Sequence, residues 1–341
     1  MTTQTAPQAA AEASQHIFQI ATGYIATTAL YVATRLRIAD RLESGARTVG
    51  ELAAETKANE DALYRVLRLL ASLGVFQQLD GRRFAHTPPS ETLKTSHPVS
   101  THPMMLWMSD PFHLKVYADA MHSVMTGQPA VEKAFGAPAF EYFRGNSELS
   151  EVFNDAMTAF SAFVIPAALD AYDFSGIDRL VDVAGGHDEV LTSILKKYPA
   201  MHGVLFDQAH VIEGAVPRIR RQGLESRCET VAGDFFESVP AAGDAYVMKH
   251  IIHDWDDDRA AAILSNIKKA RKAGGRVILL ESVLQPGNAA DFGKLIDLEM
   301  LLVPGGRERT AAEFEALFAK AGLSLTRIVP TESPLSVIEA R

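Results

Sequence analysis

The sequence predicts an α/β protein with a doubly wound, mostly parallel sheet of seven strands, preceded by an α-helical domain. Two observations support this prediction. From residue 173 onward, short apolar runs alternate with segments of helical periodicity, which is typical of parallel strands joined by crossover helices. The first run, residues 180–183, leads into Ala184-Gly185-Gly186, so that a buried strand is followed by a tight turn and a helix. Open α/β sheets bind nucleotide-like ligands at such turns.

Composition narrows the class of protein. A chain of 341 residues, 47% of them hydrophobic, is long enough for two domains with sizeable cores. Its net charge of −9 argues against a general nucleic-acid-binding protein. The one cysteine, Cys228, excludes an intrachain disulfide and suggests a reducing compartment, so we expect a cytoplasmic protein. No apolar run reaches the length of a membrane span, and we expect no membrane association.

The N-terminal part predicts a winged-helix domain at residues 16–100. Residues 1–15 are rich in Ala, Gln and Thr and are expected to form a flexible tail. Within the domain, Thr48 and Glu51 have the spacing of a capping box at the start of a short helix. A second helix follows with its apolar residues on one face, and the Asp80-Gly81 turn that comes after it favours a β-hairpin.

A winged helix often binds DNA, and the charges of the second helix decide whether this one does. That helix carries Glu60, Asp61, Arg65 and Arg68, a balanced set. A recognition helix needs a net basic face to reach phosphates. We therefore expect a structural or dimerising role for the domain.

Residues 101–172 form a connecting segment that is mostly helical and rich in Met and Phe. Flexible apolar side chains of this kind most often fill a core. A few of them could instead line an apolar pocket for an aromatic substrate. Both interpretations remain open at this point.

Polar residues end the predicted strands of the C-terminal domain, residues 173–341. In open α/β sheets the ligand lies beyond the carboxyl ends of the strands, and buried charges there are costly without a partner. An acid one βα unit after the glycine turn is well placed to accept hydrogen bonds from ribose hydroxyls. The residues at these strand ends are Asp182, Asp207, Asp234, Lys249 and Glu281.

Three further segments carry a family resemblance: VAGDFF at residues 231–236, KHIIHDW at 249–255 and GGRERT at 305–310. With them, almost the whole chain resembles the class I S-adenosyl-L-methionine-dependent O-methyltransferases of the caffeate and bacterial small-molecule type. The resemblance implies a Rossmann-like catalytic domain and a homodimer formed through the winged-helix domain. It also implies S-adenosyl-L-methionine as methyl donor, S-adenosyl-L-homocysteine as product, no metal, and a small hydroxylated aromatic substrate.

The resemblance also implies roles for individual residues. His253 would be the general base, positioned by Glu281 and Glu308, with Asp254 beside it. The substrate would lie against Trp107, Phe153, Met157, Asp297 and Met300. The cofactor would be held by Asp182, Ala184, Gly185, Gly186, Asp207, Gly233, Asp234, Phe235 and Lys249. His250, His253 and Asp254 could suggest a metal site, but two histidines and one acid are too few ligands to support it.

The glycine turn departs from the family pattern of three consecutive glycines and a fourth two residues later. Ala184 stands in place of the first glycine and Asp188 in place of the last. The methyl group of Ala184 is tolerable unless its φ is positive. Asp188 would place a carboxylate close to the cofactor, where it could attract the cationic groups or repel the carboxylate of that molecule. His187, between them, is expected at the surface of the turn.

The sequence thus predicts an O-methyltransferase acting on a hydroxyl of an aromatic small molecule. One alternative keeps the fold and the bound cofactor but uses them for hydroxylation, decarboxylation or a pericyclic reaction, and Asp188 makes that alternative less remote. Another is a winged-helix regulator that senses a metabolite. It requires salt-dependent binding to duplex DNA, against which the acidic net charge argues.

Overall fold

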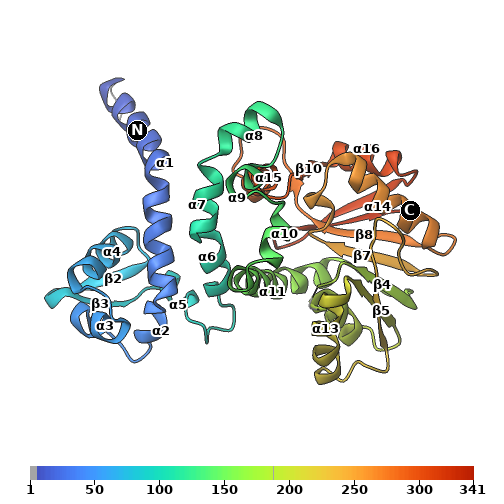
Figure 1. Ribbon diagram of the computed structural model, residues 1–341, viewed down its shortest axis with the longest axis horizontal. Coiled ribbons are helices and arrows are strands. Elements are labelled where there is room, and N and C mark those ends of the chain that lie inside the picture. The colour runs from blue at the N-terminus through green and yellow to red at the C-terminus, as the bar shows by residue number, and fades with distance from the viewer. Residues whose placement is uncertain (1–5, 187) are drawn as a thin grey trace, which may run out of the picture. The chain divides into compact units, whose positions relative to one another are not determined.

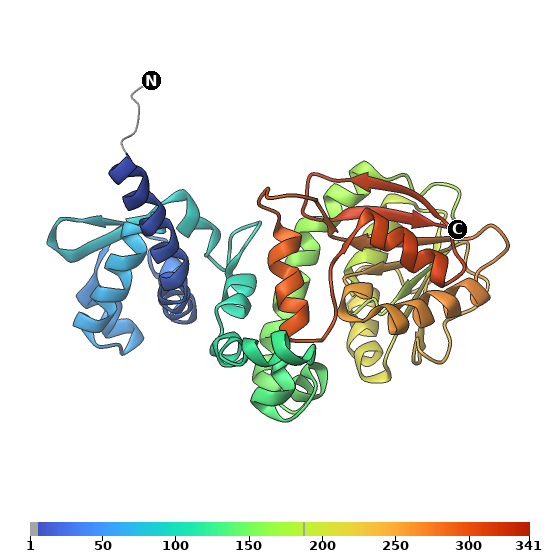
Figure 2. The same cartoon turned by 90° about the horizontal axis from the view of Figure 1, so that it is seen from above.

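The computed structural model describes residues 6–186 and 188–341, and the chain forms two compact units (Figures 1 and 2). The first unit contains the chain up to Lys115 together with Glu148–Ala159, and the second contains Val116–Ser147 and Phe160–Arg341. The segment expected to connect two domains is therefore divided between them. The reason is its longest helix, α11 (Ser147–Ala171), which continues from one unit into the other.

The first unit has the predicted order of helix, helix and hairpin. Thr48 and Glu51 form the predicted capping box, and Asn59 caps the next helix through the backbone amide of Ala62. The elements are α1 (Ala6–Arg35), α2 (Ile38–Arg41), β1 (Arg47–Thr48), α3 (Val49–Thr56), α4 (Glu60–Ser72), β2 (Phe76–Leu79), β3 (Arg83–His86), α5 (Pro88–Thr92), α6 (His102–Met108) and α7 (Pro111–Tyr117). The three strands pair in the antiparallel order β1-β3-β2.

Helix α1 begins at Ala6, so residues 6–15 are helical where a flexible tail was expected. Its polar Gln and Glu residues are compatible with an exposed helix, and periodicity alone did not reveal it. Residues 1–5 lie outside the described part of the chain. Two helices, Ala10–Arg35 and Ser147–Ala171, are long and apolar enough to cross a membrane by length and composition alone, a test that core helices of soluble proteins also pass. The expectation that no apolar run reaches the length of a membrane span was therefore wrong.

The second unit contains the predicted seven-stranded sheet, in the order β11-β12-β8-β7-β4-β5-β6. The five neighbouring strands β8, β7, β4, β5 and β6 are parallel, and β12 pairs antiparallel with both β8 and β11. The strands are β4 (Arg179–Val183), β5 (His202–Asp207), β6 (Cys228–Ala232), β7 (Ala245–Lys249), β8 (Arg276–Glu281), β11 (Leu325–Pro330) and β12 (Ser336–Ala340). The chain order reverses between β4 and β7, which is where open sheets of this kind bind ligands.

Helices cover both faces of the sheet (Figures 1 and 2). Alternate residues of each buried strand enter two separate apolar cores; in β4, Leu180 belongs to one and Val181 to the other. The first core includes α12 (Glu189–Lys197), α13 (Ala209–Arg221) and part of α11, and the second includes α14 (Asp257–Ala270) and α16 (Ala311–Lys320). The remaining elements are α8 (Ala120–Thr126), α9 (Ala130–Phe135), α10 (Ala139–Arg144), β9 (Val283–Leu284), α15 (Phe292–Leu302) and β10 (Arg309–Thr310).

Candidate active site

The glycine turn follows β4 and comes very close to the sheet. A Cβ atom on Gly185 would lie 2.4 Å from the side chain of Leu205 and 2.7 Å from the carboxylate of Asp182, so only glycine fits. Gly186 has φ +58°, and Ala184 has φ +57°. Ala184 therefore has the positive φ at which its methyl group was expected to be unfavourable. A left-handed backbone costs a residue with a Cβ atom about 1–2 kcal/mol.

Two acids flank this turn at the ends of β4 and β5. Asp182 is buried, and its Oδ2 has no hydrogen-bond partner among the described residues. Burial, followed by the charge of Asp207, raises the pKa of Asp182 to about 7. The Oδ2 atom of Asp207 accepts a hydrogen bond from the amide of Gly186 at 2.9 Å. The turn and both acids therefore form one polar edge of the sheet.

The loop after β6 adds a second close approach and an aromatic side chain. A Cβ atom on Gly233 would lie 2.5 Å from the ring of Phe206, so glycine is required here as well. The backbone amide of Gly233 donates to the carbonyl of Asp207 at 3.0 Å, which joins this loop to the end of β5. Asp234 is exposed, and the half-buried Phe235 packs edge-on against Phe236 at 4.8 Å.

Lys249 ends β7 at the same edge. Its Nζ lies 5.9 Å from the centre of the Phe160 ring. Burial lowers the pKa of Lys249, against the opposing attraction of Glu281, Asp182 and Asp254. The sheet thus brings the expected cofactor residues to one edge.

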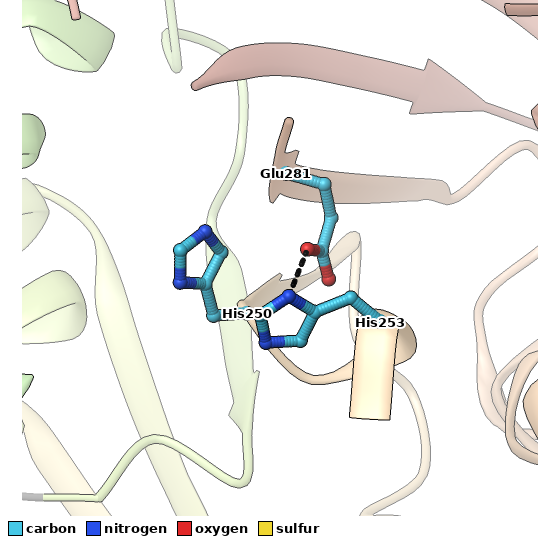
Figure 3. Close-up of side chains that lie close together, drawn as sticks. All are labelled: His250, His253 and Glu281. Carbon is cyan, nitrogen blue, oxygen red and sulfur yellow. Dashed lines mark ion pairs between the residues drawn. The ribbon is translucent and has the colours of Figure 1, made fainter. Parts of the chain in front are cut away.

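His253 lies in a short 3₁₀ turn after β7 and is 7% exposed. Its Nδ1 is 2.7 Å from Oε1 of Glu308 and 3.9 Å from Oε2 of Glu281, and its Nε2 is 3.5 Å from Oδ1 of Asp254. Figure 3 shows Glu281 approaching the ring. Burial opposes protonation of the imidazole, but the three carboxylates outweigh it and raise the pKa of His253 to about 10.

The two glutamates hold different parts of this turn. Glu308 bonds to the imidazole, whereas Oε1 of Glu281 accepts the backbone amides of Ile251 and Ile252 at 3.1 and 3.0 Å. Burial raises the pKa of Glu281 to about 7 and that of Asp254 to about 6, although the charge of His253 opposes both shifts.

From the sequence, His250 was considered only as a metal ligand. In the structure, its ring is stacked on two other rings. It stacks on that of His253 at 4.3 Å (Figure 3). It also stacks on Phe160 at 5.1 Å, and the backbone of His250 has φ +52°. Its Nε2 is buried and has no partner in the described part of the chain. One ligand atom each of His250, His253 and Glu281 lies within 4.8 Å of the others. Because His253 and Glu281 already make hydrogen bonds to the protein, we assign no metal to them.

The expected substrate residues occur in both units. In the first unit Trp107 contacts the ring of Phe153 edge-on at 5.1 Å, and Met157 is half-buried on the same helix, α11. In the second unit Met300 is buried in α15. Asp297 has a positioning contact that was not expected, because its Oδ1 accepts the backbone amide of Glu308 at 2.9 Å.

Comparison with known proteins identifies the family. Residues 117–324 match the model of the O-methyltransferase domain, and residues 18–96 match that of the O-methyltransferase dimerisation domain. The chain is 42% identical to phenazine O-methyltransferase PhzM of Lysobacter antibioticus over 96% of both chains. It is 35% identical to the mitomycin biosynthesis 6-O-methyltransferase of Streptomyces lavendulae, over 99% of this chain and 96% of that enzyme. The chain belongs to the O-methyltransferase family.

Solved structures agree with this assignment. This O-methyltransferase resembles LaPhzM with a TM-score of 0.90 and 42% identity, over 96% of its own chain and 98% of the other. It also resembles NcsB1 from neocarzinostatin biosynthesis, solved with S-adenosyl-L-homocysteine and 1,4-dihydroxy-2-naphthoic acid, with a TM-score of 0.79 and 31% identity over 92% and 95% of the two chains.

Sequence reasoning assigned no role to Arg309, although it lies in the GGRERT segment of this O-methyltransferase. Arg309 is buried, and its guanidinium bonds to Asp257 and to the carbonyl oxygens of Ile252 and Trp255 at 2.8–3.2 Å. It therefore fixes both ends of the turn that carries His253. The sequence offers one signal for Arg309, which is a charged residue in a motif that lies between the apolar segments LLVP and AA. The sequence does not show which carbonyl groups the guanidinium contacts. Tyr117 was also missed; its hydroxyl donates to the buried carboxylate of Glu299.

Proposed function

We propose that the enzyme transfers the methyl group of S-adenosyl-L-methionine to a hydroxyl of a small aromatic molecule, with His253 as general base. The observation that carries this proposal is the pair of His253 and Glu308, 2.7 Å apart and buried at the ligand-binding edge of the sheet. A carboxylate on Nδ1 holds the neutral ring in the tautomer that keeps its Nδ1 proton. That tautomer leaves Nε2 free to accept a proton.

The turn region fits the proposed methyl donor. Asp182 offers a buried oxygen that has no partner among the described residues, and a Cβ atom at Gly185 or Gly233 would collide with the side chain of Leu205 or Phe206. Asp207 is well suited to ribose hydroxyls, and Asp234 and Phe235 to the adenine. When bound, the cofactor supplies a methyl group on a positively charged sulfur. We propose that it is held by Asp182, Ala184, Gly185, Gly186, Asp207, Gly233, Asp234, Phe235 and Lys249.

In this reaction the protein has to accept one proton, the proton of the acceptor hydroxyl. The acceptor oxygen forms a bond to the methyl carbon while the carbon–sulfur bond breaks, and the hydroxyl proton moves to Nε2 of His253. A phenol with a pKa near 10, like that of tyrosine, matches the pKa of about 10 of His253. Proton transfer between matched groups costs little, and such base catalysis is worth roughly 10²- to 10⁴-fold.

The acceptor is proposed to be planar and apolar. Met300 and Asp297 of the second unit are its candidate contacts. The aromatic compound bound in the NcsB1 structure supports an aromatic ring, because NcsB1 is 31% identical to this chain. The acceptor is otherwise defined only by its hydroxyl.

We further propose that the enzyme is a homodimer located in the cytoplasm. The dimerisation-domain match covers residues 18–96, and helix α1 exposes a row of large apolar side chains over this region. A second copy would remove that surface from water. Relatives in bacterial phenazine and mitomycin biosynthesis support a small-molecule enzyme rather than a DNA-binding or membrane protein.

The test is product analysis with purified enzyme, the methyl donor and a panel of hydroxylated aromatic compounds. A product heavier by one CH₂, formed together with S-adenosyl-L-homocysteine, is the expected result. His253→Ala should lower turnover by roughly 10²-fold or more, while the affinity for S-adenosyl-L-homocysteine stays within about twofold of wild type. The control His202→Ala, at an exposed histidine that begins β5, should leave turnover unchanged. Full turnover in His253→Ala contradicts the base assignment, and a product without the added CH₂ contradicts methyl transfer.

A further inference from the structure

Asp188 occupies a position in the glycine turn where the sequence suggested a carboxylate facing the cofactor. The structure gives it a different direction. The residue is completely buried, with φ +73°, and it immediately precedes α12 without capping that helix through its side chain. An acid at a helix start usually faces the helix N-terminus or solvent. This one enters the protein interior instead.

The carboxyl group of Asp188 bonds to the end of the neighbouring helix. Its Oδ1 accepts a hydrogen bond at 3.2 Å from Nε2 of Gln222, the C-cap residue that follows α13. The same oxygen lies 3.5 Å from the hydroxyl of Thr192. A second link joins the same two helices, because Arg218 of α13 pairs with Glu189 of α12 at 2.6 Å. The start of α12 is therefore tied to the end of α13 at two points.

The turn needs such ties because its backbone is strained. Ala184 and Asp188 both have positive φ, although neither is glycine. Conformations of this kind persist only where surrounding contacts enforce them. On one side, the amide of Gly186 is held by Asp207. On the inner side, Oδ1 of Asp188 accepts hydrogen bonds from Gln222 at 3.2 Å and, more weakly, from the hydroxyl of Thr192 at 3.5 Å.

We propose that Asp188 is a positioning residue: it holds the glycine turn in its ligand-binding conformation through Gln222 and makes no contact with the cofactor. This inference rests on the proposed function, since it concerns the cofactor site of the same reaction. Asp188 has a positive φ although it is not glycine, and its bond to Gln222 holds it in that conformation from inside the protein.

The proposal requires a hydrogen-bond acceptor at residue 188 rather than a negative charge. Burial raises the pKa of Asp188 to about 6, with Arg218 opposing the rise and Glu189 adding to it. The buried carboxylate is therefore a costly way to make this bond, and a neutral amide of the same shape should replace it. Asparagine also tolerates left-handed backbone well.

The experiment is calorimetric titration of full-length variants with S-adenosyl-L-homocysteine at pH 8, with KM for the methyl donor and kcat measured in parallel. Asp188→Gly should weaken binding about tenfold and raise KM more than it lowers kcat. Asp188→Asn should stay within twofold of wild type. Gln222→Met should weaken binding several-fold, and the double variant Asp188→Gly/Gln222→Met should be no weaker than Asp188→Gly alone. Glu213→Gln, at an exposed carboxylate of α13, is the control.

Three results overturn the inference. If Asp188→Asn loses as much affinity as Asp188→Gly, the negative charge itself acts on the ligand. If Asp188→Gly binds as tightly as wild type while its thermal midpoint shifts, the residue serves stability alone. If the effects of Asp188→Gly and Gln222→Met add fully, the two residues do not act as a pair.

Failure of the proposed function is a separate result: wild type binds S-adenosyl-L-homocysteine but methylates no acceptor. Should Asp188→Gly fail to fold, Asp188→Asn and Gln222→Met still decide the question.

Discussion

The three carboxylates around His253 set the pH range in which this proposed base would accept a proton. With a pKa of about 10, the imidazole carries a proton at neutral pH. We expect kcat/KM to rise roughly tenfold per pH unit from pH 7 to pH 9, because the neutral form increases by that factor. The profile is measured as initial rates of S-adenosyl-L-homocysteine formation. A flat profile over this range contradicts a base of raised pKa.

Glu308→Gln tests the cause of that pKa. The amide oxygen can still accept the Nδ1 proton, so the ring stays oriented, but the charge that stabilises the imidazolium is removed. We expect the rising limb of the kcat/KM profile to move about one unit toward neutral pH. Glu315→Gln, at an exposed carboxylate of α16, should leave the limb in place. An unmoved limb in Glu308→Gln means that another group sets the profile.

The buried carboxyl group of Asp188 leads to a prediction about the free energy of unfolding and its dependence on pH. Its pKa in the folded protein, about 6, exceeds the ordinary value of 3.8, so ionisation above pH 6 costs folding free energy that is absent well below pH 4. Asp188→Asn should therefore raise the free energy of unfolding at pH 8 by up to about 3 kcal/mol. The gain should shrink at pH 5. Denaturant unfolding at both pH values measures it, and a gain that is equal at both contradicts the buried ionised carboxyl.

At the scale of elements, the turn at His253 depends on the segment that follows α15. The backbone amide of Arg307 donates to the carbonyl of His253 at 2.8 Å. A Cβ atom on Gly306 would lie 1.9 Å from that same carbonyl oxygen. We expect Gly306→Ala to lower turnover at least about tenfold, because a displacement of 1 Å at a catalytic group can cost 10²-fold.

Two measurements separate this effect from general damage. Gly306→Ala should keep its affinity for S-adenosyl-L-homocysteine within about twofold, since the glycine turn lies on other elements. Gly214→Ala makes the same chemical change in α13, where a Cβ atom meets nothing within 4 Å, and should leave turnover intact. Equal activity of Gly306→Ala and wild type would show that the close approach does not control His253.

The elements that could be predicted from the sequence are those set by local pattern. Alternating apolar runs gave the central strands, and the Thr48 capping box and the Asp80-Gly81 hairpin were found where local rules predict them. Positive φ at Ala184 and the inward direction of Asp188 could not be predicted, because both depend on hydrogen bonds to residues more than twenty positions away. The contact of Asp297 with Glu308 spans only eleven positions, but it depends on how the chain turns back after α15, which local sequence rules do not reveal.

At the scale of the whole molecule, the family motifs predicted more of the candidate site than composition did. The KHIIHDW and GGRERT segments lie far apart in the chain, and the structure brings His253 and Glu308 within hydrogen-bond distance. Unit boundaries were harder to predict. Helix α11 has no glycine and no break at residue 159, where the chain changes units, so the sequence carries no local signal there.

The apolar surface of α1 gives the last prediction, which concerns assembly. Ile17, Phe18, Ile20, Tyr24 and Ile25 are 46–68% exposed, an unusual cost for a monomer in water. We expect wild type to elute with twice the 37.0 kDa chain mass in light scattering. Ile20→Glu with Tyr24→Glu should give a folded monomer, because burying two like charges at an isologous interface is unfavourable. Ala312→Glu with Ala319→Glu on α16 should remain dimeric. A dimeric Ile20→Glu/Tyr24→Glu variant contradicts this interface, and wild type that sediments with lipid vesicles indicates that α1 binds membranes instead.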